Sequence, residues 1–261
     1  MTILDKIVLR KKEEVALAKA RVSIAQLESR EAFKRPVFSL REFLLDPART
    51  GIIAEFKRRS PSKGTINDRV SVEEVTTGYA AAGASALSVL TDNDFFGGSP
   101  ADLIAAREVN DIPILRKDFM IDEYQVPEAK AMGADIILLI AAILTPAQIG
   151  QMTLLAKSLG LSVLLEVHNL EELQRSIHPG IDAIGVNNRN LADFTVSVQT
   201  SFNLAAHIPA GFMKISESGI SDAGTIKQLK KAGFNGFLIG ENFMRGPDPA
   251  AAMQTFVTHL Q

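Results

Sequence analysis

Short apolar runs recur along the chain from Gly51 onward, and each run ends in polar or charged residues. The runs are continuous and do not alternate with polar positions, which is typical of parallel strands that are covered on both faces. They predict eight strands, at 52–56 (IIAEF), 86–90 (ALSVL), 112–116 (IPILR), 135–140 (DIILLI), 162–167 (SVLLEV), 183–186 (AIGV), 213–216 (MKIS) and 236–240 (GFLIG).

Helical patterns lie between these runs, and several begin after a residue type that caps helices well. Ser71, Ser99, Thr145 and Asp222 each stand just before such a pattern, and proline follows Ser99 and Thr145. Glycine commonly ends a helix because it takes the left-handed backbone conformation without strain. The predicted helix ends are Gly83, Gly133, Gly160 and Gly233.

The first fifty residues follow a different pattern. Ile3, Ile7 and Leu17 recur close to the 3.6-residue period of a helix, with charged residues between them, and a second helical stretch begins near Ser39. We therefore expect a helical N-terminal extension over residues 1–50. No linker rich in Pro, Gly or Ser divides the chain, so we expect one domain over 1–261.

Residues 51–261 supply about 26 residues for each of eight units, which suits one strand, one helix and two short loops. Eight such βα units predict a (β/α)8 TIM barrel. An open, doubly wound parallel sheet is the alternative architecture. That fold often carries a glycine-rich first turn, whereas the first turn here reads KRRSPSKG.

The composition excludes several classes of function. Apolar residues make up 46% and charged residues 22% of the chain, so it is not disordered, and a net charge of −2 supplies no global field for nucleic acid or a membrane. The absence of cysteine excludes disulfides, thiol nucleophiles and cysteine-bound metals. No apolar run reaches the roughly 18 residues of a membrane span, and the N-terminus lacks a signal sequence. We expect a cytoplasmic protein.

Polar residues at the predicted strand ends are the candidates for chemistry, because the active site of a TIM barrel lies at the carboxyl ends of its strands. Any one of them would be explained by the strand leaving the core. Together they place several acids and two lysines around one barrel mouth, and such clusters are typical of active sites. They are Glu55, Lys57, Lys117, Glu166, Asn187, Arg189 and Glu217.

The loops after the seventh and eighth strands predict a phosphate site, as is common in barrels of this kind. Ser218-Gly219 follows one strand and Gly240-Glu241 follows the other, while Ser60 and its neighbours in SPSKG lie in the first loop and are placed to close over the same anion. Each glycine taken alone is also an ordinary turn residue.

Large apolar residues near the predicted barrel mouth are suited to hold an aromatic substrate, although core packing is the more usual role of a phenylalanine. His168 follows the fifth strand, and we expect it to lie behind the site or on the surface. The four histidines form no metal-binding spacing and no hydrolase triad. The candidates for the aromatic wall are Phe96, Phe119, Leu138 and Ile140.

Seven motifs in order resemble the indole-3-glycerol-phosphate synthase family: AEFKRRSPSKG, LSVLTDNDFFGGS, PILRKDF-IDEYQ, LLEVHN, IGVNNRNL, SESGI and LIGENFMR. The resemblance extends over nearly all of the chain. It implies closure of an indole ring on a phosphorylated substrate, with loss of carbon dioxide and water, and it implies no cofactor, no metal and no obligate protein partner.

The resemblance also implies roles for individual residues. Lys117 is the expected general acid and Glu166 the expected general base, with Lys57 as a second acid. Glu55 and Glu217 orient the lysines, Asn187 binds a hydroxyl, Arg189 attracts the substrate carboxylate, and Leu191 joins the aromatic wall. The phosphate site comprises Lys57, Ser60, Ser218, Gly219, Gly240 and the backbone of Glu241.

Glu241 departs from the family pattern, because many relatives carry serine there. Its acidic side chain cannot bind phosphate, so we expect the backbone N–H to point inward and the carboxylate to face solvent. Two alternatives remain open: another phosphate-binding barrel enzyme, such as phosphoribosylanthranilate isomerase, and a non-catalytic barrel that binds a phosphorylated metabolite. The lack of cysteine disfavours the isomerase, and the set of acids and bases disfavours the binder.

Overall fold

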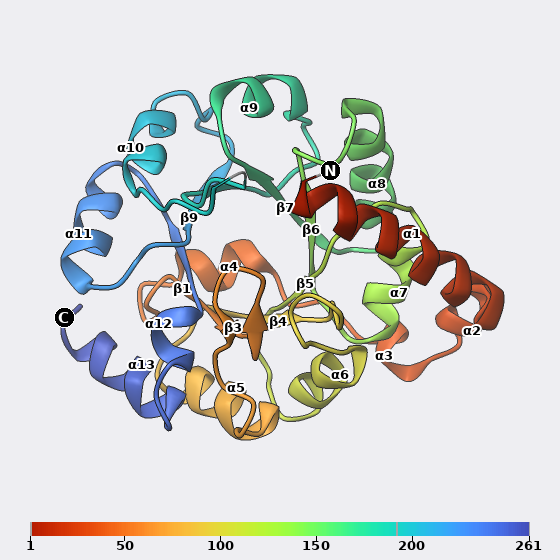
Figure 1. Ribbon diagram of the computed structural model, residues 1–261, viewed down its shortest axis with the longest axis horizontal. Helices are drawn as coiled ribbons and strands as arrows, with labels where there is room; N and C mark the ends of the chain where they lie inside the picture. The colour runs from red at the N-terminus through yellow and green to blue at the C-terminus, as the bar shows by residue number, and fades with distance from the viewer. Residues whose placement is uncertain (1, 192, 261) are drawn as a thin grey trace.

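A closed barrel of eight parallel strands forms the centre of the molecule, in the order β1-β10-β9-β8-β7-β6-β5-β4 (Figure 1). The computed structural model describes residues 2–191 and 193–260. The predicted (β/α)8 fold is confirmed. The barrel strands are β1 (Ile52–Phe56), β4 (Ala86–Leu90), β5 (Ile114–Lys117), β6 (Ile136–Ile140), β7 (Ser162–Val167), β8 (Ala183–Asn187), β9 (Met213–Glu217) and β10 (Gly236–Ile239).

Helices surround the barrel, as Figure 1 shows, and a short hairpin of β2 (Arg59–Ser60) and β3 (Gly64–Thr65) follows β1. The helices after the extension are α5 (Val72–Ala81), α6 (Pro100–Glu108), α7 (Gln125–Ala131), α8 (Pro146–Ser158), α9 (Leu170–Ser176), α10 (Gln199–Ala205), α11 (Ala223–Lys231), α12 (Glu241–Met244) and α13 (Pro249–Thr258).

The continuous apolar runs are explained by two separate cores. Side chains alternate along each strand, so Ile53 of β1 packs inside the barrel with residues such as Leu115 and Leu164. Its neighbours Ile52 and Ala54 point outward and pack beneath the helices. Both faces of each strand are therefore removed from water, as the sequence pattern predicted.

The predicted helix caps are confirmed in the structure. The side chains of Ser71, Ser99, Thr145 and Asp222 each accept a backbone hydrogen bond from the first turn of the following helix. The strand bounds shift by one or two residues. β5 begins at Ile114 and not at residue 112, since the intervening proline has no N–H to offer a neighbouring strand.

The N-terminal extension is helical as expected, but it contains more helices than the sequence indicated, and these reach both ends of the barrel. Leu40 and Leu44 of α4 pack with the residues inside the barrel, beside the first residue of β10. The first turns of α1 border the opposite mouth, and Figure 1 shows this helix running outward from the neighbourhood of β6 and β7 towards α2. The helices of the extension are α1 (Ile3–Arg21), α2 (Ile24–Glu28), α3 (Glu31–Lys34) and α4 (Leu40–Leu45).

Candidate active site

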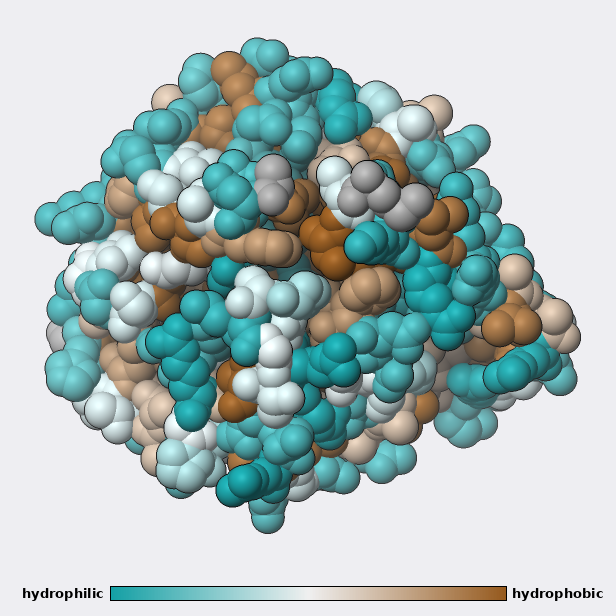
Figure 2. All heavy atoms as spheres, viewed as in Figure 1, coloured by the Kyte–Doolittle hydropathy of each residue, from teal (hydrophilic) through white to brown (hydrophobic). Residues whose placement is uncertain are grey.

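A cavity opens at the carboxyl ends of the barrel strands. Figure 2 shows apolar and polar side chains side by side around the middle of this face. All of the site residues expected from the sequence line this cavity, except Gly219 and Gly240. The lining residues that were predicted are Glu55, Lys57, Ser60, Phe96, Lys117, Phe119, Leu138, Ile140, Glu166, Asn187, Arg189, Leu191, Glu217, Ser218 and Glu241.

Lys117 lies at the centre of the charged part of the cavity, at the end of β5. Its Nζ atom is 2.8 Å from Glu166 Oε2 on β7 and 3.1 Å from Glu217 Oε2 on β9. The Lys117 side chain is 15% exposed, and both glutamates are more deeply buried. Three strands far apart in the sequence thus bring one ammonium group and two carboxylates into direct contact.

Burial and charge act against each other at these groups. Burial would lower the pKa of Lys117, but Glu166 and Glu217 raise it above its ordinary range. Burial would raise the pKa of Glu166, but the positive charges of Lys117 and His168 hold it below its ordinary range. Burial raises the pKa of Glu217 to about 7, despite Lys117, and nearby Glu166 adds to the increase. Glu217 is therefore partly protonated near neutral pH.

A second ion pair borders the same cavity at the end of β1. Lys57 Nζ is 2.7 Å from Glu55 Oε1, and Ser88 Oγ donates to Glu55 Oε2 at 3.3 Å. Gly240 packs directly against this carboxylate, because a Cβ atom there would lie 2.6 Å from Glu55 Oε1. Gly240 is thus required for the close approach of two strand ends, although its atoms do not line the cavity.

The remaining polar groups hold Glu166 from its other side. Asn187 Nδ2 donates to Glu166 Oε1 at 3.1 Å. His168 Nε2 lies 3.3 Å from the same oxygen, and the His168 side chain is only 9% exposed. His168 therefore lies behind the site, which was one of the two expected locations, and not on the surface.

Apolar side chains form the opposite wall of the cavity. The rings of Phe96 and Phe119 pack at a tilt, with their centroids 5.8 Å apart. Leu138 and Ile140 of β6 line the cavity with them. A flat aromatic group fits beside such a wall, since it gains apolar contact without losing a hydrogen bond.

The loop after β9 carries an uncommon backbone conformation. Ser218 and Gly219 have φ angles of 68° and 76°, and a non-glycine residue rarely takes such a value without a structural or functional reason. Ser218 lines the cavity, and so do Ser60 and Ser62 of the loop after β1. Both loops therefore contribute serine side chains to the cavity in which the sequence predicted an anion site.

The expectation for the carboxylate of Glu241 is wrong. Its side chain is only 19% exposed and lines the cavity, because ion pairs with two arginines replace the contacts that the carboxylate would make with water. Arg189 Nη2 lies 3.3 Å from Glu241 Oε2, and Arg245 pairs with Oε1. The Arg189 guanidinium also approaches Ser62 Oγ at 3.5 Å, so it spans the predicted anion site.

α1 contributes a wall that the sequence did not assign to the site. Ile3, Leu4 and Ile7 line the cavity, although the sequence indicated only that two of them share an apolar helix face. Phe194 and Leu238 also line it. No local motif distinguishes Ile3, Leu4 and Ile7 as site residues, because they meet the site only after the extension docks on the barrel.

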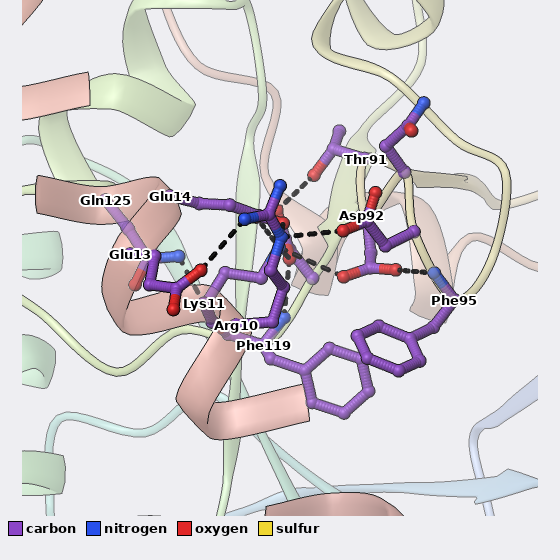
Figure 3. A network of polar contacts seen from close by, with 12 residues as sticks. Arg10, Lys11, Glu13, Glu14, Thr91, Asp92, Phe95, Phe119 and Gln125 are labelled. Carbon is purple, nitrogen blue, oxygen red and sulfur yellow. Dashed lines mark hydrogen bonds and ion pairs between the residues drawn. The ribbon is translucent and has the colours of Figure 1, made fainter. Parts of the chain in front are cut away.

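A buried lysine anchors α1 on the barrel mouth (Figure 3). Lys11 Nζ lies 2.9 Å from Asp118 Oδ1, 3.1 Å from Asp92 Oδ2 and 2.7 Å from Glu14 Oε2. Asp118 directly follows Lys117 in the chain. The anchor of α1 is therefore connected to the strand end that carries the central lysine.

Residues 2–191 and 193–260 show neither a metal-binding cluster nor a membrane-spanning helix. Within these ranges, no three His, Asp or Glu side chains are grouped so that they would hold a metal ion. The helices there are each too short or too polar to cross a membrane.

Relatives of the chain carry the family name that its motifs suggested. The family model for indole-3-glycerol phosphate synthase matches residues 4–256. The chain is 50% identical over 260 residues to an indole-3-glycerol phosphate synthase of Bacteroides thetaiotaomicron, covering 99% of each chain. It is 45% identical to the protein of that name from Laribacter hongkongensis, covering 96% of this chain and 97% of the relative.

Solved structures with little sequence identity share the fold. A 3-hexulose-6-phosphate synthase from Salmonella typhimurium superposes with a TM-score of 0.61 at 14% identity, covering 81% of this chain and 98% of the other. A thiamine phosphate pyrophosphorylase from Pyrococcus furiosus gives 0.60 at 19% identity, covering 85% and 99%. With the family model spanning nearly the whole length and the relatives near half identity, the chain belongs to the indole-3-glycerol phosphate synthase family.

Proposed function

We propose that this protein converts 1-(2-carboxyphenylamino)-1-deoxy-D-ribulose 5-phosphate to indole-3-glycerol phosphate, carbon dioxide and water, a step of tryptophan biosynthesis. Family membership supports the reaction. The proposed roles of the residues rest on one observation: Lys117 contacts Glu166 and Glu217 in a cavity that also holds Lys57 and an apolar wall.

The first stage forms a carbon–carbon bond. The ring carbon that bears the carboxylate attacks the ketone carbon of the sugar chain, and negative charge develops on the ketone oxygen. Lys117 donates a proton to this oxygen, which becomes a hydroxyl group. The raised pKa of Lys117 keeps the ammonium form available at neutral pH. The ring then loses carbon dioxide, and the electrons of the broken bond restore its aromaticity.

The second stage removes the new hydroxyl group as water. Lys57 supplies the proton to the leaving oxygen, and Glu166 takes the proton whose loss creates the double bond of the indole. Glu55 holds Lys57 at 2.7 Å, and Asn187, which donates a hydrogen bond to Glu166, binds a substrate hydroxyl. Glu217 also contacts Lys117, at 3.1 Å, and supports it.

Binding of the substrate uses the two contrasting sides of the cavity. Phe96, Phe119, Leu138, Ile140 and Leu191 hold the aromatic ring. The phosphate rests against Ser60, Ser218 and the backbone N–H of Glu241, with Lys57 nearby. Gly219 and Gly240, which do not line the cavity, shape the two loops that carry these groups. Arg189 attracts an anionic group of the substrate. It also neutralises Glu241, which would otherwise repel that group.

The test is a fluorescence assay for indole formation with purified protein and the proposed substrate, without added cofactor. Wild-type protein is expected to produce the fluorescent product. Lys117→Ala should lower turnover at least about a hundredfold, the lower end of acid–base contributions, with an unchanged fold by circular dichroism. Lys227→Ala, which changes an exposed lysine of α11, is the matched control and should retain wild-type turnover.

Two outcomes would contradict the proposal. A flat fluorescence trace from protein that still binds a phosphorylated substrate analogue would favour a non-catalytic binding barrel. Wild-type turnover in Lys117→Ala would refute the role of Lys117 as general acid while leaving the reaction itself in place.

A further inference from the structure

His168 is a buried, charged side chain to which the reaction proposed above assigns no role. It directly follows β7, two residues after Glu166, and its imidazole lies between two carboxylates. Nε2 is 3.3 Å from Glu166 Oε1, and Nδ1 is 3.1 Å from Glu172 Oε2 on α9. His168 is not among the residues that line the cavity, so any effect on the reaction passes through Glu166.

Glu172 holds the imidazole from the outer side, and it is itself firmly placed. Its Oε2 atom accepts the backbone N–H of His168 at 2.8 Å, and its Oε1 atom accepts Asn169 Nδ2 at 3.0 Å. Asn169 is the N-cap of α9 and accepts the backbone N–H of Glu172 at 2.8 Å. The start of α9 is thus folded around the histidine, which fixes the direction of the ring.

The charge of the imidazole follows from these two neighbours. Burial would lower the pKa of His168, but Glu166 and Glu172 raise it to about 10. At neutral pH the ring is an imidazolium, whose Nδ1–H donates to Glu172 Oε2 and whose Nε2 forms an ion pair with Glu166 Oε1 without hydrogen-bond geometry. Glu166 therefore lies between two cations, with Lys117 at its Oε2 atom and His168 at its Oε1 atom.

The two cations differ in what happens to them during the proposed reaction. Lys117 gives its proton to the ketone oxygen in the first stage, and it then no longer carries the charge that holds Glu166. His168 does not contact the cavity and keeps its proton. Glu166, which acts as the base in the second stage, is then still held in place by the charged His168 and by the amide of Asn187.

We propose that His168, held by Glu172, is a positioning residue for Glu166: it fixes the orientation of this carboxylate and keeps it ionised while Lys117 is without its proton. The inference rests on the proposed role of Glu166 as general base. The other titratable groups near Lys117 are Glu217 on β9, which is partly protonated near neutral pH, and Glu55 on β1, and negative charge on either group disfavours ionisation of Glu166. A fixed positive charge at residue 168 offsets them.

His168→Gln removes the positive charge and leaves an amide that is able to donate a hydrogen bond. We expect kcat to fall about ten- to hundredfold, as for a misplaced catalytic group, with KM within twofold of wild type. The acidic limb of the kcat profile should move about one pH unit higher, because Glu166 loses an opposite charge and binds its proton more tightly. His168→Lys keeps a cation and should keep the acidic limb at its wild-type position.

Two further variants give independent evidence. Glu172→Gln leaves His168 in place but removes the carboxylate that supports its charge, so it should add an alkaline loss of kcat at pH values where the wild type is still active. Glu171→Gln changes the exposed neighbouring carboxylate on α9 and is the matched control, with an unchanged profile. Circular dichroism and thermal unfolding report whether each variant is folded.

The outcomes separate this inference from the proposed function. An inactive wild type would refute the function, whereas an active wild type with an inactive Glu166→Gln variant confirms the basis for the test. Against that background, a wild-type pH profile in both His168→Gln and Glu172→Gln would overturn the positioning role. A loss of kcat without any shift of the pH limbs would also overturn it, because it would show that His168 acts only in packing.

Discussion

Lys11 offers the sharpest test of how the N-terminal extension is held on the barrel. Its side chain is 4% exposed, and its ammonium group contacts Asp92 and Asp118 as well as Glu14 of its own helix. Asp92 Oδ2 accepts no hydrogen bond within the described ranges, so the ion pair with Lys11 is what compensates the burial of this oxygen. The perturbation is Lys11→Met, which keeps the apolar stem of the side chain and removes the charge.

The expected loss of stability is about 3–5 kcal/mol, the usual cost of removing one partner of a buried ion pair. Asp118 is affected less than Asp92, because Arg116 Nη2 lies 3.1 Å from its Oδ2 atom and Thr91 Oγ1 donates to that atom at 2.6 Å. Asp92 is left with backbone N–H groups only, on its other oxygen. For a chain of this size the loss corresponds to a fall of roughly 6–20 °C in Tm.

The assay is urea unfolding at pH 7, followed by circular dichroism, for wild type and for Lys11→Met. Lys12→Met alters the adjacent, exposed lysine of the same helix and should change the free energy of unfolding by less than about 0.5 kcal/mol. Adding Asp92→Asn to Lys11→Met should recover part of the loss, since the uncompensated charge is removed. If Lys11→Met is as stable as Lys12→Met, the proposed ion-pair anchor of α1 is refuted.

Two further predictions concern other buried charges. Glu217 has a folded-state pKa of about 7 against an ordinary value of 4.5, so the folded protein holds this proton more tightly. The contribution of Glu217 to the free energy of unfolding therefore falls by roughly 3 kcal/mol as pH rises from about 4.5 to 7. Urea unfolding at pH 5 and pH 7 should show a smaller fall in Glu217→Gln, and an equal fall in both proteins would contradict the assignment. Asp135 is fully buried between Arg35 at 2.6 Å and Arg107 at 2.9 Å, so Asp135→Asn should lose about 3–5 kcal/mol in urea unfolding. In the fluorescence assay the kcat and KM of Asp135→Asn should match wild type, because Asp135 stands before β6, away from the cavity. A loss of less than about 1 kcal/mol in the free energy of unfolding would argue against the two ion pairs of Asp135.

The local features of the fold were predictable because they depend on neighbours in the chain. A capping side chain such as Ser71 or Thr145 bonds to backbone groups three residues away, and a strand such as β7 is visible as an uninterrupted apolar run. The convergence of Lys117 and Glu166 was also predictable, because each stands at a strand end and a closed parallel barrel brings all strand ends together.

Other parts of the site depended on contacts that no local pattern contains. The sequence indicated an apolar face on α1, but only the folded chain brings Ile3 and Ile7 to the cavity and Lys11 to Asp92. Glu241 was expected to face solvent, and the structure turns it inward because Arg189, distant in sequence, reaches it.

Local residue patterns thus specify the elements, their order and the residues that stand at the strand ends. Which of the buried charges meet, and therefore which protonation states they adopt, depends on how the elements pack together. The reason is physical: helix caps and apolar periodicity act over a few residues, whereas the pKa of a group such as Glu217 depends on distances of a few ångströms between side chains that only the closed barrel brings together.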